Sequence, residues 1–511
     1  MLLEDVLELS RSRTPDKVAV VAGDVRLTYA ELDDTANRVA NGLLARGVGR
    51  GDRVTIHLDA GIALVIAVFA TLKVGAAFTM VHPSTKPAKL GRVIADSEPR
   101  AIFVPAAKLH APQGDGLAGP LAAESLRAIV SVGGPAPETD HRMVAYDTLV
   151  ADGSTGAPAK WDIDQDLAAI IYTSGSTGEG KGVMLTHLNM VTAIRSIVDY
   201  LGLRSDDVVF CPLSLSFSYG LTNLFATLLA GGRFVIERSI AYRAATLARM
   251  AAEGTTGMPM VPSIAPLLLG GDLHEFDLSK LRWITNAGAA LPEEHVRRIR
   301  AALPNVSLYP MYGQTECIRA AYLEPRYVDA KPTSVGRAIP NTEVWVVDEH
   351  GQRAAPGVIG ELVVRGANVM RGYLNKPAET AKKLREGPVP GEKVLYTGDL
   401  FRTDEDGHLH FVARSDDIIK SRGEKVAPRE VEEVILTLEG VAQAAVVGVP
   451  DPILGEAVKA FIVPVPGFEL TRAAVQRHCA ARLEDFMVPS QVELRDALPH
   501  TDSGKIAKRE L

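Results

Sequence analysis

Apolar runs alternate along the chain with helical patterns. Residues 27–47 open with Leu-Thr-Tyr-Ala-Glu and continue with apolar positions three to four residues apart, which predicts a capped amphipathic helix. Residues 60–72 are almost wholly apolar and have a charged residue at each end, which predicts a buried helix. Short apolar runs at 54–58 and 77–81 predict strands on either side of that helix. The same alternation continues past residue 300, so we predict α/β layers with largely parallel sheets.

The pattern changes near residue 340. Three shorter strand-like segments, at 344–348, 360–365 and 408–412, are separated by glycine and turn residues and predict a β-rich subdomain. Residues 105–125, rich in Ala, Pro and Gly, predict a surface excursion.

The pattern of predicted helices and strands changes again after Arg414. Two predicted helices (429–437 and 472–482) and three predicted strands (441–449, 457–464 and 490–494) make a compact α+β unit. The predicted fold class is therefore α/β, with a large N-terminal domain of layered α/β subdomains plus a β-rich subdomain, and a small mobile α+β C-terminal domain. The predicted domains are residues 1–414 and 415–511.

Composition narrows the class of protein. With 511 residues the chain exceeds what one hydrophobic core usually holds, and its formal net charge of −7 argues against a general nucleic-acid binder. The three cysteines match no metal spacing or disulfide framework, which favours a reduced cytosol. The N-terminus is acidic and has no signal-peptide pattern, and the longest apolar run is too short to span a bilayer. We therefore expect a cytoplasmic monomer or homodimer with no nucleic-acid or membrane partner.

The strongest chemical signal is residues 167–182, Leu-Ala-Ala-Ile-Ile-Tyr-Thr-Ser-Gly-Ser-Thr-Gly-Glu-Gly-Lys-Gly, in which an apolar strand runs into a loop. Glycines let backbone N–H groups approach phosphate oxygens, hydroxyls add donors, and Lys181 supplies a point charge. A flexible connector would not need the strand or the lysine. The predicted phosphate-loop residues are Thr173, Ser174, Gly175, Ser176, Thr177, Gly178 and Lys181.

The spacing from Gly175 to Lys181 also fits the nucleotide-binding loop of P-loop NTPases. That loop needs Ser or Thr after the lysine to hold Mg²⁺, and this chain has Gly182 there. A Val-Met-Leu run follows instead of a helix start. We therefore reject the P-loop interpretation.

The loop resembles the phosphate-loop signature of the AMP-forming adenylating superfamily, which includes acyl-CoA synthetases, peptide-synthetase adenylation domains and luciferases. Four further segments resemble motifs of the same superfamily: Tyr-Gly-Gln-Thr-Glu at 312–316, Tyr-Thr-Gly-Asp at 396–399, Arg-Ser-Asp-Asp at 414–417 and Pro-His-Thr-Asp-Ser-Gly-Lys at 499–505. Each is weak alone, and the identification rests on their recurrence along almost the whole chain.

The resemblance implies that the protein binds ATP and Mg²⁺. Tyr312 would stack on adenine, Asp399 and Arg414 would contact the ribose, and Glu316 would be the metal ligand. Lys505 would offset charge that builds on the α-phosphate in the transition state. The expected catalytic residues are Lys505, Thr315, Glu316 and Lys181, and the remaining expected ATP-binding residues are Gly288, Ala289, Tyr312, Gly313, Asp399 and Arg414.

The resemblance also implies two half-reactions. After an acyl-adenylate forms, the small domain would turn about a hinge at Asp416 so that a thiol can reach the adenylate. Because the chain stops at Leu511 with no carrier domain after the lysine motif, we expect the thiol to belong to CoA or to the phosphopantetheine of a separate carrier protein. The expected thiol-tunnel residues are Ser421, Arg422, Gly423 and Lys425, with Gly423 leaving room for pantetheine.

Residues 216–232 resemble the acyl-pocket segment of amino-acid adenylation domains, which carry Asp directly after the phenylalanine. This chain has Ser218 there, and a buried ammonium without a carboxylate is costly, so we predict an acid that lacks an α-amino group. Small residues at 287–289 favour a planar or branched acyl group, and Arg319 is either a contact for a polar group of the substrate or a surface charge. The expected acyl-pocket residues are Phe217, Ser218, Tyr219, Met258, Val261, Asn286, Ala287, Gly288, Gly313 and Ile318.

Together these expectations predict ATP-dependent activation of a small non-amino carboxylic acid, medium aliphatic or aromatic, to acyl-AMP with release of pyrophosphate, followed by transfer to CoA. The alternative is a standalone acyl-AMP ligase that loads a separate acyl or peptidyl carrier protein in a biosynthetic pathway. A non-catalytic ATP- or acyl-binding protein is a third hypothesis, which the intact charged motif residues disfavour.

Overall fold

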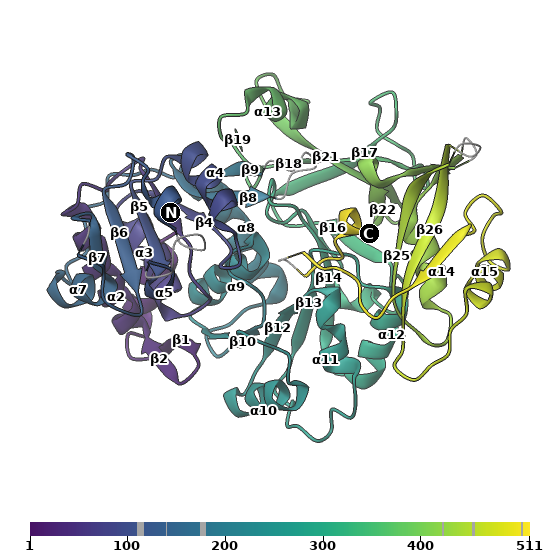
Figure 1. Cartoon of the computed structure of the whole chain (residues 1–511), viewed down its shortest axis with the longest axis horizontal. Coiled ribbons are helices and arrows are strands. Elements are labelled where there is room, and N and C mark those ends of the chain that lie inside the picture. The colour runs from purple at the N-terminus through teal and green to yellow at the C-terminus, as the bar shows by residue number, and fades with distance from the viewer. Residues whose placement is uncertain (110–116, 139, 174–179, 422–423, 452–454, 502–503) are drawn as a thin grey trace.

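Three sheets organise the chain in a computed structural model that describes residues 1–511 except 110–116, 139, 174–179, 422–423, 452–454 and 502–503. The N-terminal third lies at the left of Figure 1 and the last hundred residues at the right, with the middle of the chain between them. The predicted α/β class, with a large N-terminal part and a smaller α+β C-terminal part, is confirmed.

The first sheet has eight strands, in the order β19-β9-β8-β4-β3-β5-β6-β7. All neighbours are parallel except the two pairs that β9 makes, with β8 and with β19, so the parallel prediction is confirmed here. Its strands are β3 (Arg53–Ile56), β4 (Ala77–Met80), β5 (Ala101–Pro105), β6 (Ala128–Val132), β7 (Met143–Ala145), β8 (Leu167–Thr173), β9 (Lys181–Thr186) and β19 (Gly372–Tyr373).

Helices cover this sheet, and the two that the sequence predicted are both present. The first, α2 (Tyr29–Leu44), begins at a capping box in which Thr28 and Glu31 each accept a hydrogen bond from the other's backbone N–H. The second, α3 (Ile62–Lys73), is buried from Leu64 to its end. The other helices of this region are α1 (Asp5–Arg13), α4 (Pro87–Ser97), α5 (Ala106–Leu109), α6 (Ala118–Leu121), α7 (Tyr146–Asp152) and α8 (His187–Leu201).

The predicted surface excursion at 105–125 is only partly a surface feature. Leu117 and Leu121 are buried in an apolar cluster with Leu90 and Ile94 of α4, because the short α6 packs against that helix. Residues 110–116 of the excursion lie outside the described residues.

The second sheet has fourteen strands, in the order β17-β18-β21-β22-β16-β15-β14-β13-β12-β10-β11-β1-β2, with β20 beside β21. From β11 to β14 neighbours are parallel, and from β14 onward they are antiparallel. The β-rich region predicted after residue 340 is therefore continuous with the parallel sheet. The strands are β1 (Val18–Ala22), β2 (Val25–Thr28), β10 (Val208–Cys211), β11 (Arg233–Ile236), β12 (Gly257–Met260), β13 (Trp283–Asn286), β14 (Ser307–Tyr312), β15 (Ala321–Tyr322), β16 (Ser334–Ala338), β17 (Thr342–Val347), β18 (Gly360–Gly366), β20 (Leu384–Glu386), β21 (Lys393–Thr403) and β22 (Leu409–Arg414).

The sequence did not predict β21, whose alternation of apolar and polar residues is interrupted by Gly398 at φ +76°. The helices that follow or flank these strands are α9 (Ser218–Leu229), α10 (Arg243–Glu253), α11 (Ala265–Leu269), α12 (Glu293–Ala302) and α13 (Pro377–Lys383).

The third sheet forms after residue 414 and has its own apolar cluster, which includes Ile419, Val431, Val458 and Val475. The helices and strands predicted there are present to within two residues at each end. The boundary between 414 and 415 as a domain limit stays a prediction. The elements are β23 (Ile419–Ser421), β24 (Glu424–Val426), α14 (Pro428–Leu436), β25 (Val441–Asp451), β26 (Gly455–Pro464), α15 (Arg472–Ala480) and β27 (Gln491–Leu494).

After β27 the chain turns back, and Ile506 and Leu511 pack against the apolar cluster of Ala445, Phe461 and Leu498. Within the described part of the chain, every helix falls short, in length or in apolar character, of what a membrane crossing needs.

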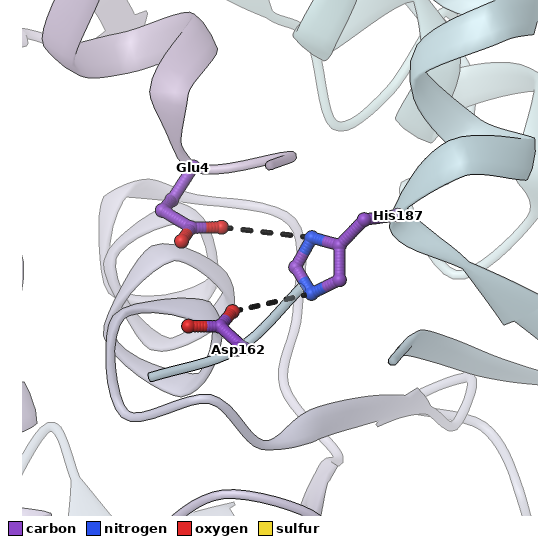
Figure 2. Close-up of side chains that lie close together, drawn as sticks. All are labelled: Glu4, Asp162 and His187. Atoms are coloured by element: carbon purple, nitrogen blue, oxygen red, sulfur yellow. Dashed lines mark ion pairs between the residues drawn. The ribbon is translucent and has the colours of Figure 1, made fainter. Parts of the chain in front are cut away.

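A buried cluster of three titratable side chains fixes the N-terminus. Glu4, just before α1, and Asp162, in the segment before β8, approach the ring of His187 at the start of α8 (Figure 2), with separations of 3.7 Å from Glu4 to Nδ1 and 3.6 Å from Asp162 to Nε2. The backbone N–H of Leu3 donates to Nδ1 at 2.9 Å, so this nitrogen is an acceptor and is not free to bind a metal ion. Burial lowers the pKa of His187 and raises the pKa of Glu4 to about 8. Burial therefore favours the uncharged forms of Glu4 and His187, which together with Asp162 form a clasp at the N-terminus.

The Glu4 clasp predicts a dependence of stability on pH. Because the folded pKa, about 8, lies above the ordinary value of 4.5, the folded state keeps a proton that the unfolded state has lost, and stability falls as pH rises through that window. Glu4→Gln keeps the uncharged shape, so at pH 8 its free energy of unfolding should exceed that of the wild type by about 4 kcal/mol. The two should converge below about pH 4.5 in chemical denaturation.

The exposed Glu275 provides the matched control, since Glu275→Gln should leave the pH profile unchanged. Superimposed profiles for the wild type and Glu4→Gln would contradict the clasp.

Candidate active site

Three parallel strands end side by side in the second sheet. Met260 of β12 pairs with Asn286 of β13, which pairs with Pro310 of β14, so the residues that follow these strands lie at one edge. In open α/β sheets this edge, at the carboxyl ends of the strands, is where ligands bind. The edge brings together segments that the resemblance assigned to ATP, such as 312–316, and to the acid, such as 286–288.

Asp399 is held by groups from two directions. The Tyr312 hydroxyl and the Gln314 side-chain amide both donate to its Oδ2, each at 2.7 Å. Arg414, its register partner across β21 and β22, places Nε 3.5 Å from Oδ1. Oδ1 is buried and accepts no hydrogen bond from any described residue. One oxygen of Asp399 is thus hydrogen-bonded to the protein, and the other faces Arg414 and has no hydrogen-bond donor among the described residues.

Tyr312 acts as an anchor for this carboxylate. Burial and the charge of Asp399 raise the pKa of Tyr312 well above its ordinary value, so the hydroxyl keeps its proton and donates it to the hydrogen bond. The ring also packs edge-on against Phe401, with 4.8 Å between ring centroids. Stacking of Tyr312 on adenine stays a prediction, whereas the anchoring contact is an addition that the sequence did not suggest.

Lys181 and Glu316 meet a second group of side chains that the sequence analysis missed. Tyr373 of β19 donates to Glu316 Oε1 at 2.7 Å, and Lys181 Nζ lies 5.2 Å from the centre of the Tyr373 ring. Lys181 Nζ also bonds Glu379 Oε2 at 2.9 Å. Lys181, with Lys382 beside it, lowers the pKa of Glu379 to about 2, so this carboxylate is ionised at neutral pH.

The predicted phosphate loop begins and ends at a paired position. Thr173 of β8 and Lys181 of β9 are register partners, so Lys181 lies at the base of the loop. Ser174, Gly175, Ser176, Thr177 and Gly178 fall outside the described residues.

Lys505 reaches the same edge from the C-terminal segment. A Cβ added at Gly288, where φ is +85°, would lie 3.6 Å from Lys505 Cε and 3.4 Å from Val261, so a side chain there would crowd the lysine. The preceding Gly504 lies against Val261 and Ser263. Although the side chain is accessible to solvent, the protein around it lowers the pKa of Lys505, helped by Arg414 and opposed by the carboxylates Asp399 and Glu316.

The expected acyl-pocket residues lie around the same edge. Phe217, directly before α9, stacks on His82 with 5.8 Å between ring centroids, and the Tyr219 hydroxyl lies 2.7 Å from Thr285 Oγ1. Met258 and Val261 are buried in an apolar cluster against which Tyr219 packs. Arg319 is only 2% exposed and lies 5.0 Å from the centre of the Tyr219 ring, so the alternative of a surface charge is wrong.

The predicted hinge and tunnel residues belong to the segment that follows β22. Asp416 is exposed in the short turn Ser415–Asp417 that joins β22 to β23. Ser421 is buried in β23, Arg422 and Gly423 lie outside the described residues, and the side chain of Lys425 is not among those described.

The residues present suit a magnesium nucleotide. Asp399 Oδ1, which has no hydrogen bond from the described residues, could accept one from a ribose hydroxyl, and Lys181 and Lys505 could pair with phosphate oxygens. Glu316 offers one carboxylate, and Mg²⁺ is commonly bound by one or two carboxylates together with phosphates and water. The half-buried Thr315 beside it adds a hydroxyl.

Matches to protein-family models identify the family of this chain. The model of the AMP-binding enzyme family matches residues 7–374, and that of the AMP-binding enzyme C-terminal domain matches residues 430–505. The chain belongs to the AMP-binding enzyme family. The resemblance recognised in the sequence is therefore confirmed.

Relatives of the AMP-binding enzyme family differ in length. The feruloyl-CoA synthase of an Amycolatopsis species is 34% identical over 502 residues, covering 98% of this chain and 96% of that protein. The probable CoA ligase CCL9 of Humulus lupulus is 30% identical, covering 99% and 95%. Tyrocidine synthase 3 of Brevibacillus parabrevis is also 30% identical over the whole chain, which spans only 8% of that longer protein.

Solved structures agree with the family. The anthranilate CoA ligase AuaEII in complex with anthranoyl-AMP superposes with a TM-score of 0.90 at 25% identity, covering 100% of this chain and 96% of that one. ATP-bound MatB from Rhodopseudomonas palustris gives 0.88 at 28% identity, covering 100% and 98%. The fold and the family are those of AMP-forming acid–CoA ligases.

The anchoring of Asp399 predicts a mutational phenotype. Tyr312→Phe removes one donor from Oδ2 while leaving the ring in place, so Asp399 should be free to turn away from the ribose. We expect KM for ATP to rise about tenfold, as for loss of one charge-assisted hydrogen bond, with a smaller change in KM for the acid. Acid-dependent release of pyrophosphate measures both constants.

Tyr327→Phe is the control, because Tyr327 packs edge-on against His408 outside this edge. An unchanged KM for ATP in Tyr312→Phe would show that Gln314 alone positions Asp399.

Proposed function

We propose that this protein activates a carboxylic acid that carries no α-amino group with ATP, releases pyrophosphate, and transfers the acyl group to the thiol of CoA. The observation that carries the proposal is the position of Lys505, whose Cε lies against Gly288 at the strand edge that also carries Asp399 and Glu316. A lysine near a C-terminus is usually solvated, and here it lies close to a carboxylate oxygen without a hydrogen bond from the described residues, at Asp399.

In the first half-reaction the acid's carboxylate oxygen attacks the α-phosphorus, and the bond to pyrophosphate breaks. Asp399 would bind the ribose, while Lys505 and Lys181 would offset the charge on the phosphate oxygens as two anions approach. Mg²⁺ held by Glu316 would neutralise phosphate charge. Glu379 would have to release Lys181 to the phosphates.

In the second half-reaction the thiol sulfur attacks the acyl carbonyl and AMP leaves. The exposed turn at Asp416 is suited to be the hinge, since a short solvated segment can change its backbone angles at little cost. The CoA ligases matched along nearly their whole length support CoA as acceptor.

The acid is proposed to be aromatic or medium aliphatic. Ser218 opens α9 where amino-acid adenylation domains carry Asp, so the pocket lacks a carboxylate at the place where an ammonium would need one. The named substrates of the matched ligases, ferulate and anthranilate, support an aromatic acid in particular.

Lys505→Ala is expected to lower the rate of adenylation about 100-fold to 1,000-fold, because one preorganised charge is lost from the transition state. The assay is acid-dependent release of pyrophosphate at saturating ATP.

Lys508→Ala is the matched control, since Lys508 bonds Glu432 of α14 at 2.6 Å and lies three residues further along the same segment. Adenylation that survives in Lys505→Ala, or fails equally in both variants, would remove the catalytic assignment of Lys505.

A panel of acids, each tested with CoA and with a phosphopantetheinylated carrier protein, decides between the acceptors. Thioester with CoA is expected, and thioester only with the carrier protein would favour a carrier-loading ligase instead.

In the same panel, an acid without an amine should be adenylated about tenfold or more faster than its α-amino analogue, because a buried unpaired ammonium is costly. The reverse order would contradict the argument from Ser218.

A further inference from the structure

Arg319 is a buried cation without an anionic partner. Its side chain is nearly inaccessible, Nε is buried without a hydrogen-bond acceptor, and no described residue forms an ion pair with the guanidinium. The contact that it makes is the face of the Tyr219 ring, 5.0 Å away. Lys73, which is buried to a similar degree, is by contrast paired with both Asp33 and Glu8 at 2.8 Å.

Such an arrangement is unfavourable in the free protein. A guanidinium stays protonated in proteins, so Arg319 cannot escape the cost of burial by losing its charge. Attraction to one tyrosine ring offsets only part of the lost hydration. A buried cation held in this way is explained when a ligand supplies the missing anion.

The backbone holds Arg319 in place. Ile318 has φ +62°, a conformation that β-branched residues rarely adopt, and Arg319 N–H donates to Cys317 O at 2.5 Å across this tight turn. The buried amide of Asn368 donates to the carbonyls of Cys317 and Arg319, at 3.0 and 2.7 Å. The reversal at Ile318 therefore directs the side chain inward and fixes it there.

The guanidinium lies against one wall of the expected acyl pocket. That wall is Tyr219, one residue after Ser218 at the start of α9. The backbone of Arg319 lies against Gly313, another expected pocket residue, where an added Cβ would lie 2.9 Å from Arg319 Cα and 2.6 Å from Ile318 O. The cation thus contacts the residue next to Ser218, the position at which amino-acid adenylation domains carry an anion.

We propose that Arg319 determines substrate specificity by binding a second carboxylate, remote from the one that is activated, so that the substrates are dicarboxylic acids. This inference rests on the proposed function and names the substrate class for that site. Arg319 pairs with the distal carboxylate while the other carboxylate faces the α-phosphate. The planar guanidinium suits a carboxylate because it can donate two parallel hydrogen bonds.

Matched acids test the proposal: benzoate against isophthalate and terephthalate, hexanoate against adipate, and the monoamide of each diacid as its uncharged isostere. The measurement is kcat/KM for acid-dependent release of pyrophosphate. At least one diacid should exceed both its monoacid and its monoamide about 100-fold, because a site built for a hydrogen-bonded group rejects analogues that leave it unpaired. Arg319→Met should lose about 100-fold on that diacid and change the monoacid less than about threefold, with Arg319→Lys in between.

Arg326→Met is the control, because Arg326 also lies over a tyrosine ring, that of Tyr327, but is exposed and paired with Glu324. It should leave every constant unchanged. If Arg319→Met does not fold, the wild-type panel still decides, since it needs no variant.

The outcomes separate the two proposals. A wild type that activates monoacids as well as every diacid, or an Arg319→Met variant that loses monoacids and diacids equally, overturns the second-carboxylate proposal and leaves acid activation standing. Preference for a monoamide over its diacid overturns it as well. Absence of pyrophosphate with every acid refutes the proposed function itself.

Discussion

The carboxylate of Asp399 joins the two halves of the second sheet. Tyr312 and Gln314 reach it from the end of the parallel half, whereas Asp399 and Arg414 belong to the antiparallel half. Because both donors use the same oxygen, the second oxygen keeps a fixed direction without being consumed. Two further charged groups lie close to this junction: the loop after β14 carries Glu316, and Lys505 lies near Asp399, Glu316 and Arg414.

Charges at the site are balanced before any nucleotide binds. Glu379 pairs with Lys181, and the Tyr373 hydroxyl donates a hydrogen bond to Glu316. Lys181 and Glu316 therefore each have a partner of their own and are not paired with each other. The low pKa of Glu379 keeps it anionic at neutral pH, so in the proposed reaction phosphates would compete for Lys181 with a permanent negative charge. Phosphate oxygens win such a competition when several donors act at once, and this is the role proposed for the glycines and hydroxyls between Thr173 and Lys181.

Local signals were enough to predict much of the fold. The Thr28 cap, the apolar helix α3 and the short strands of the first sheet depend on residues close in sequence, and they appear where expected. The union of the β-rich region with the parallel sheet was not predictable in this way, because the joining strands β15 and β16 are short and the sequence did not predict β21.

Some residues of the candidate site could likewise be predicted from the sequence, and others could not. Motif residues such as Asp399 and Lys505 could be named from the sequence, since the resemblance rests on short contiguous segments. Glu379 could not, because 198 residues separate it from Lys181 and only the pairing of β19 with β9 brings them together. The burial of Arg319 could not be predicted either, because a charged residue shortly after Tyr-Gly-Gln-Thr-Glu is expected in an exposed loop. The positive φ of Ile318, which turns the Arg319 side chain inward, is visible only in the structure.

Electrostatics links substrate choice to this hidden residue. Ser218 leaves the expected pocket without a carboxylate for an ammonium, and Arg319 places a cation against Tyr219, so both disfavour an ammonium and the second attracts an anion. An acid that brings its own second charge supplies Arg319 with the kind of partner that Lys73, buried to a similar degree, has in Asp33 and Glu8. The contact between Arg319 and the second carboxylate is remote from the α-phosphate. Its binding energy can hold the reacting carboxylate in place against repulsion by the phosphates. In this way a contact far from the reacting atoms raises the rate of the chemical step.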